Sequence, residues 1–281
     1  MKTLKISALL FAGLLCANTM SAQKGAYAKF NLGYNFSLNS DNITTESTTT
    51  DGVTLSEKNI TGSFGKGLAL GGTFGYMFSD NIGAELGLNY LLGGTFESED
   101  KSTGTTTGFE YVSTLNQKFS AKMFQINPSI VLSAGKTKGL NPYARFGIVL
   151  GMAGKITNEN DRVQTGLGAY TSKSVNELSG GMALGWSAAF GATYNFSEKL
   201  GLFGEMNMIN MSWAPTSMTV TESTTDGVDN LPTMDVNQKE TEFVDEVKST
   251  DNVSNTVAST ALKNNFSFSS LGIQIGLRFQ F

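Results

Sequence analysis

The chain has 281 residues, of which 16% are charged, 10% are aromatic and none is histidine. With a mean hydropathy of -0.09, this composition excludes both a disordered chain and a bundle of membrane helices. The formal net charge of -4 at pH 7 argues against nucleic-acid binding, which requires an excess of cations. What remains is an all-β protein, either soluble or in a membrane.

Residues 1–23 are expected to form a secretory signal peptide that is cleaved after Ala22 or Gln23. Two lysines near the start precede an apolar stretch over 6–17, which is too short to span a bilayer as a helix. Cys16 follows a leucine rather than the small residue that lipid anchoring requires. The signal therefore predicts export through the Sec pathway and a mature chain, 24–281, that contains no cysteine.

The mature chain is organised in segments whose apolar residues alternate with glycine or polar residues. A period of two predicts β-strands, and the segments reach the roughly 9–11 residues of a tilted transmembrane strand. Soluble strands average about 5–6 residues, so the lengths favour a membrane protein. The alternation covers eight segments, around 28–36, 68–78, 82–90, 124–132, 143–150, 181–196, 200–208 and 271–281.

The connections between these segments alternate between short and long. Short turns are expected around 79–81, 135–139 and 197–199, whereas the long, Thr-, Ser- and Asn-rich connections cover about 39–62, 93–117, 154–179 and 212–264. This alternation predicts a transmembrane antiparallel up-and-down β-barrel, with four long extracellular loops and both termini on the periplasmic side. Eight strands are expected, and a ten-stranded barrel that uses part of 212–264 as an extra hairpin is the alternative.

The end of the chain carries a resemblance to a known family. The signal peptide, the eight amphipathic strands, the glycine-rich lumen face and the terminal Leu277-x-Phe279-x-Phe281 resemble small bacterial outer-membrane barrels of the OmpA/OmpX type. The stretch Asn141–Gly147 is similar to the fifth strand of porin-like members. The resemblance implies outer-membrane lipid as the surroundings and Leu277, Phe279 and Phe281 as the signal read by the barrel-assembly machinery. Unlike many OmpA members, the chain is expected to lack a peptidoglycan-binding domain.

Five charged residues are expected to point into the lumen because of their place in the alternation. An eight-stranded barrel has an interior just wide enough for its own side chains, so three cations and two acids would have to pair there. They would form either a structural ion-pair plug or a gated polar lumen. The five residues are Lys29, Glu85, Arg145, Glu205 and Arg278.

The sequence offers no catalytic, cofactor or metal site. The known lipid-modifying and proteolytic barrels resemble one another in using a site that contains histidine, the usual general base near neutral pH, and this chain has none. We find no G-x-S-x-G elbow, no Walker loop and no EF-hand spacing. The chain is therefore expected not to be an enzyme and to carry no cofactor and no metal.

The long connections hold most of the acidic residues. Segment 212–264 contains nine acids and three lysines, which indicates either a solvated acidic loop or a site for a divalent cation or a partner. Residues 45–53 and 221–228 resemble each other and share an Asp-Gly dipeptide, a hairpin-turn signal. This similarity is either chance in Thr- and Ser-rich sequence or the mark of paired β-extensions beyond the membrane.

These observations predict a non-enzymatic outer-membrane β-barrel protein, a structural scaffold that displays acidic extracellular loops. A narrow porin-like channel or small-solute transporter is one alternative, and an accessory subunit of a larger outer-membrane complex is another. The expected partners are outer-membrane lipid, the barrel-assembly machinery during insertion, and an extracellular or envelope protein bound through the loops. Nucleic acid is not expected as a partner.

Overall fold

The computed structural model describes residues 25–38, 41–106, 108–134, 139–248 and 254–281. The expected signal peptide lies outside the described residues. Regular structure in the described part is almost entirely β, and the predicted all-β barrel is confirmed. The described helices, the 3-10 helix η2 (Leu231–Thr233) and α2 (Val236–Lys239), are both too short to cross a membrane.

Eight strands pair in a closed antiparallel ring. Each strand pairs with the next, and the last pairs with the first, so the ring has no free edge. The pairing describes eight strands rather than ten. In order around the ring the strands are β1 (Ala26–Ser37), β4 (Gly67–Met77), β5 (Ile82–Gly93), β7 (Phe109–Ser133), β8 (Leu140–Gly166), β10 (Ala183–Asn195), β11 (Leu200–Trp213) and β17 (Ser270–Gln280).

The two faces of the ring differ as the alternation predicts. Large apolar side chains such as Phe30, Phe146 and Phe190 point outward and are about two-thirds exposed. Inward positions carry small or polar side chains, or apolar ones that are buried. Because this belt of exposed apolar residues runs around the whole ring, it is far larger than the apolar patches of soluble monomers. The outer face is therefore suited to a lipid environment.

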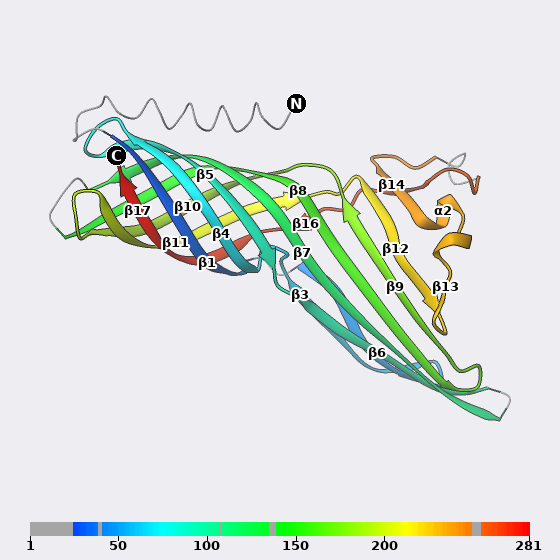
Figure 1. Ribbon diagram of the computed structural model, residues 1–281. Helices are drawn as coiled ribbons and strands as arrows, with labels where there is room; N and C mark the ends of the chain where they lie inside the picture. The colour runs from blue at the N-terminus through cyan, green and yellow to red at the C-terminus, as the bar shows by residue number, and fades with distance from the viewer. Residues whose placement is uncertain (1–24, 39–40, 107, 135–138, 249–253) are drawn as a thin grey trace.

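The segments that were expected to be long loops are mostly strands, which corrects the loop prediction. Strands β7 and β8 continue well beyond the ring, with 25 and 27 residues, and carry a sheet that we call the extension (Figure 1). Their polar side chains suit a sheet with water on its surfaces. The other strands of the extension are β2 (Asp41–Thr50), β3 (Val53–Gly62), β6 (Phe96–Thr106), β9 (Tyr170–Ser179), β12 (Ser217–Thr225), β13 (Val228–Asp229), β14 (Glu240–Val244) and β15 (Ser259–Leu262).

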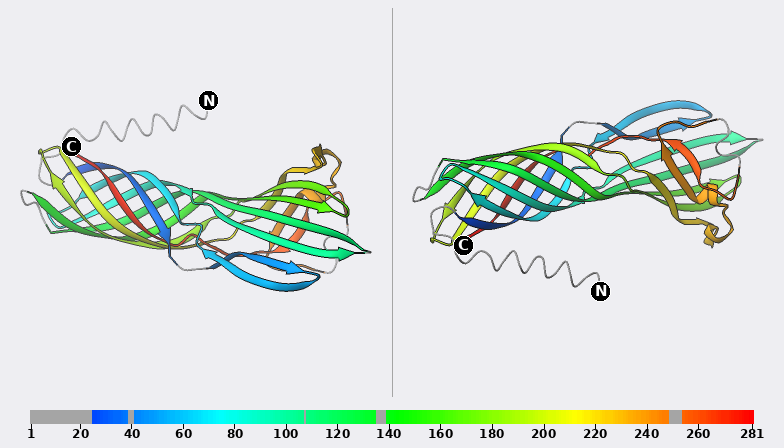
Figure 2. Two further views of the ribbon diagram at one scale, coloured as in Figure 1. Left: turned by 90° about the horizontal axis from the view of Figure 1, so that it is seen from below. Right: turned by 90° about the horizontal axis from the view of Figure 1, so that it is seen from above.

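The extension ends in a hairpin on either side, and on one side β2 pairs with β6 in parallel, unlike the antiparallel pairs of the ring. Strand β6 joins β2 and β3 to β7, and β9 joins β12 to β8. The short strand β16 (Phe266–Ser267) pairs with β11 and leads back into the ring. Barrel and extension form one elongated body, and the C-terminus lies at the end of the barrel opposite the extension (Figures 1 and 2).

The two Asp-Gly dipeptides form equivalent turns, one in each of these hairpins. Asp51-Gly52 and Asp226-Gly227 all have positive φ, between 48° and 79°, as a type I′ turn requires. The Asp51 N–H donates to the Thr103 carbonyl at 2.8 Å, and its carboxylate accepts from a backbone N–H of β6. Asp226 makes the same two contacts to Thr171 of β9, at 2.9 and 2.7 Å. Each hairpin is thus fastened by its turn to a longer neighbouring strand.

Candidate functional site

The barrel lumen is the candidate site because the inward charges meet there. From the short-turn end toward the extension, inward side chains form a layer of ion pairs, a layer of amides and hydroxyls, and an apolar plug. The order follows from the register of the strands, which sets inward residues of neighbouring strands at matching heights. The ion-pair and amide layers are filled by side chains of the ring, and the plug also contains Phe64, Phe96 and Phe268 from segments beside it.

Glu85 on β5 is the centre of the first ion-paired group. Its carboxylate accepts from the Lys29 ammonium and from the Tyr27 hydroxyl, each at 2.5 Å. The Glu85 side chain is fully buried and that of Lys29 is 4% exposed. The Lys29 ammonium also lies 4.5 Å from the centre of the Tyr143 ring, so its free side faces an aromatic surface.

Glu205 on β11 is the centre of a second group of the same composition. It accepts from the Arg145 guanidinium at 2.5 Å and from the Tyr143 hydroxyl at 2.8 Å. Arg145 also reaches Glu85, at 3.6 Å, and so joins the two groups. The four charges are two cations and two acids, which leaves the cluster neutral inside a space without bulk water.

The fifth predicted residue, Arg278, lies outside these ion pairs. Its guanidinium stacks on the Tyr27 ring at 4.0 Å and donates to the Gln280 side chain at 3.2 Å. Within the described residues it forms no ion pair with Glu85 or Glu205. The structure therefore brings four of the five residues together and places the fifth beside them, toward the short-turn end, where a position near water solvates its charge.

Sequence reasoning missed the two tyrosines that complete the groups. Tyr27 stands two residues before Lys29, and Tyr143 stands two residues before Arg145, so both face inward by the same alternation. The Tyr143 hydroxyl donates to the Glu205 oxygen that Arg145 does not bond, an oxygen that would otherwise be buried without a partner, a loss that costs several kcal/mol for a charged group. The Tyr27 hydroxyl donates to the same Glu85 oxygen as Lys29, and the second Glu85 oxygen has only the longer contact to Arg145. The Tyr-x-cation spacing on two strands is the signal that could have identified them.

Above the ion pairs, amide and hydroxyl side chains bridge the lumen. The Asn31 amide donates to Gln274 at 3.0 Å, and the Asn127 amide donates to Ser187 at 3.0 Å. The lumen space left beside Asn31 and Gln274 is a cavity of about 10 Å³. This is close to the smallest volume that holds a single water molecule.

An apolar plug closes the lumen where the barrel meets the extension. Trp213, Phe64 and Phe268 lie at its centre with ring centroids about 6 Å apart, and all three are at most 2% exposed. The Trp213 indole N–H donates to the Gly180 carbonyl at 3.0 Å, so its polar atom is satisfied. The other buried members are Leu91, Phe96, Ala121, Met123, Val149, Ile156, Ala183, Ile209 and Met211.

The expected assembly signal lies on the outer face at the short-turn end. Leu277, Phe279 and Phe281 are all exposed, and Phe279 contacts Phe30 edge-to-face with ring centroids 6.2 Å apart. The Phe281 N–H donates to the Ala26 carbonyl at 3.0 Å, which joins the last residue to the first strand. Recognition of these residues by an assembly machinery stays a prediction. Among the described residues, no three acidic side chains are grouped as a metal site.

Comparison with known families supports the interpretation of this geometry. A model of the outer membrane protein beta-barrel domain matches residues 7–279. The chain belongs to this family. Membership makes it an integral protein of the bacterial outer membrane, and the apolar belt on the ring is its lipid-facing surface.

Three solved outer-membrane barrels are similar to this chain at low sequence identity. OprG from Pseudomonas aeruginosa is 12% identical with a TM-score of 0.41, and the alignment covers 92% of this chain and 97% of OprG. Ail, the attachment invasion locus protein of Yersinia pestis, is 9% identical with a TM-score of 0.29, over 90% and 99%. CarO2 from Acinetobacter baumannii is 12% identical with a TM-score of 0.28, over 91% and 98%. No curated protein matches the sequence.

Proposed function

We propose that this outer-membrane β-barrel is a non-enzymatic, non-conducting scaffold that holds its extension in the extracellular space. The filled lumen is the observation that carries the proposal. A conducting pore needs a continuous path for water, and here the ion pairs, the amide layer and the apolar plug lie one above another. These layers support a scaffold over the alternative of a narrow channel or small-solute transporter.

The orientation follows the plan of bacterial barrels. Periplasmic turns are short in this class and extracellular connections are long. The extension then faces the outside, and both ends of the mature chain face the periplasm. Its strands pair side by side, and its two Asp-Gly turns fasten the outer hairpins, so it can stand away from the membrane as a fixed shape.

The charge of the extension indicates which kind of partner could bind its surface. Segment 212–264 contains nine acids and three lysines. It is held against β9 by Lys173, whose ammonium lies 3.0 Å from the Glu222 carboxylate. The hydrogen bond to Glu222 raises the pKa of Lys173. An extracellular or envelope protein with a basic surface is the partner class that this charge favours.

Protease treatment of intact cells tests the display of the extension. We expect cleavage between Glu240 and Lys263, while the strands of the ring stay protected in the membrane. A matched variant in which 217–263 is replaced by a short glycine turn keeps the β11–β17 pairing and should resist cleavage there. Cleavage only after the outer membrane has been opened would contradict the proposal.

A further inference from the structure

The outer face of the barrel carries two lysines directly beyond the apolar belt. Lys122 on β7 is paired in register with Leu92 on one side and with Lys155 on the other. The next row toward the barrel consists of Tyr90, Phe124 and Met152. These three outward residues belong to the lipid-facing belt, so the two ammonium groups lie at the level where the acyl region of a leaflet gives way to its headgroups.

A depression in the surface surrounds these lysines. It is an open pocket of about 220 Å³, lined by Leu92, Ser120, Thr157 and the lysines, together with the backbone of the adjoining residues. The ladder is interrupted here, because the β7–β8 register shifts beside Lys122 and the bulged residue Ala153 has a positive φ of 50°. The pocket is therefore a consequence of the backbone where the barrel continues into the extension.

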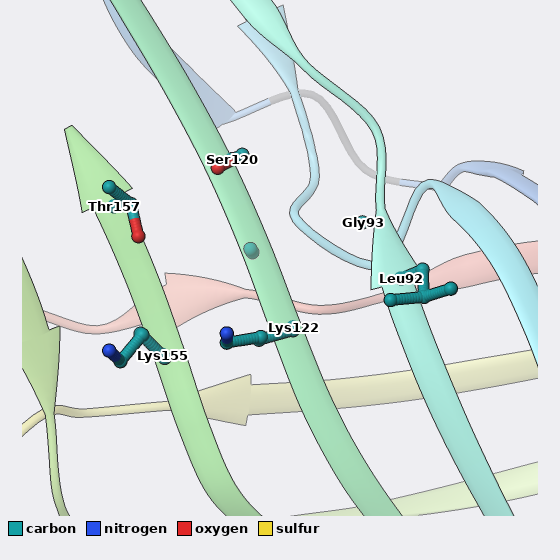
Figure 3. A pocket seen from close by; sticks show the side chains of 7 residues that line it. Leu92, Gly93, Ser120, Lys122, Lys155 and Thr157 are labelled. Atoms are coloured by element: carbon teal, nitrogen blue, oxygen red, sulfur yellow. The ribbon is translucent and has the colours of Figure 1, made fainter. Parts of the chain in front are cut away.

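The charges around the pocket are incompletely balanced. Like charges directly opposite each other on neighbouring strands are destabilising. Lys155 is compensated by Glu177, 2.5 Å away on β9. Figure 3 shows its side chain turned away from Lys122, whereas the Lys122 side chain reaches across toward β8. Within the described part of the chain, Lys122 has no ion-pair partner. Two cations and one carboxylate leave a net positive charge beside the pocket.

We propose that this pocket binds the phosphate of a membrane lipid. The Lys122 ammonium would contact the phosphate oxygens, the Thr157 and Ser120 hydroxyls would donate to them, and the acyl chains would lie along the belt below Leu92. A lipid is favoured over a free anion because the pocket is continuous with the lipid-facing surface. Binding would give the barrel a fixed depth in the leaflet, independently of whether its lumen conducts.

Native mass spectrometry of the folded barrel in neutral detergent tests this site. The probes are phosphatidic acid, diacylglycerol with the same chains, and inorganic phosphate. We expect the wild type to retain phosphatidic acid and not diacylglycerol, and millimolar inorganic phosphate not to displace the lipid. Lys122→Gln should weaken retention about fivefold, the effect of one surface cation on an anionic lipid, and Lys122→Arg should restore it.

The control is Lys118→Gln, on the same strand and face but two rows of the extension further out, opposite Glu97. It removes the same charge and should retain phosphatidic acid as the wild type does. Heat-modifiable mobility of each variant establishes that it is folded. Equal retention by the wild type and Lys122→Gln would overturn the proposal. Full displacement by inorganic phosphate would also overturn it, because the site would then be one for a free anion.

Discussion

The ion pairs in the lumen predict a large and specific loss of stability when one acid is neutralised. In Glu205→Gln the side chain keeps its shape but loses its charge, and the cluster of Lys29, Glu85, Arg145 and Glu205 changes from neutral to a charge of +1. Arg145 then keeps only the longer contact to Glu85, at 3.6 Å. An arginine cannot release its proton at accessible pH, so its charge stays buried.

The burial of the pair sets the size of the effect. The Arg145 side chain is 9% exposed and that of Glu205 is 2% exposed. Breaking a buried pair by removing one partner costs about 3–5 kcal/mol. We expect Glu205→Gln to lower the free energy of unfolding by about that amount. Glu85→Gln should do the same, since Glu85 is the ion-pair partner of Lys29.

Urea unfolding of the barrel in detergent or lipid vesicles measures these losses. The matched control is Glu97→Gln, which neutralises an exposed acid 4.0 Å from Lys118 and should change stability by less than about 1 kcal/mol. A double variant, Lys29→Met with Glu85→Gln, restores a neutral cluster. The loss of stability in this double variant should be smaller than the sum of the losses in Lys29→Met and in Glu85→Gln, each measured alone. We expect a difference of about 0.5–3 kcal/mol, the range for residues in contact.

One result would refute this reasoning. If water filled the lumen, it would solvate the charges after substitution, and Glu205→Gln would match the Glu97→Gln control. The lumen substitutions would then alter ion selectivity rather than stability. Equal stability of both variants and wild type, with unchanged folding cooperativity, would show that these charges are not desolvated.

The remaining predictions concern the plug, the strand packing and the orientation. Trp213→Ala removes the centre of the apolar plug and should cost about 3–5 kcal/mol while it raises conductance in a planar bilayer; an unchanged, silent barrel would contradict the role of the plug. A Cβ at Gly276 would overlap the Phe30 carbonyl oxygen, whereas a Cβ at Gly204 meets nothing within 4 Å. Gly276→Ala should therefore destabilise the barrel by about 1–3 kcal/mol, and Gly204→Ala should leave its stability unchanged. Unfolding curves of the two variants measure this difference. Cysteine at Thr225 should react with a membrane-impermeant reagent on intact cells and cysteine at Ser197 should not, and the reverse pattern would invert the topology.

The barrel itself could be predicted because its period of two is unusually regular. A closed ring in lipid must turn every second residue outward, so segments such as 271–281 reveal both the strand and its lipid face. The same parity identified Lys29, Glu85, Arg145 and Glu205 as inward residues. The alternation along a strand shows only whether a side chain points inward or outward. The register between strands decides which inward residues meet, and for this reason Arg278 was grouped with residues that it does not pair with.

The extension was predicted incompletely for a different reason. Its strands lie in water on their surfaces and are rich in Thr, Ser and Asn, so they lack the apolar alternation that marks the ring. Their order comes from pairing with the continuing strands β7 and β8, which is non-local. The repeated Asp-Gly was the local signal for hairpins in these segments, and the docking of Asp51 and Asp226 on neighbouring strands could be seen only in three dimensions.

The single-channel conductance of the wild-type barrel in a planar bilayer tests the central claim most directly. A lumen filled by two Tyr–cation–Glu groups, an amide layer and an apolar plug should give small or no steady current. The Trp213→Ala variant in the same bilayer establishes that inserted protein would be detected if a path were open. A large, steady conductance of the wild type would contradict the scaffold and favour a channel.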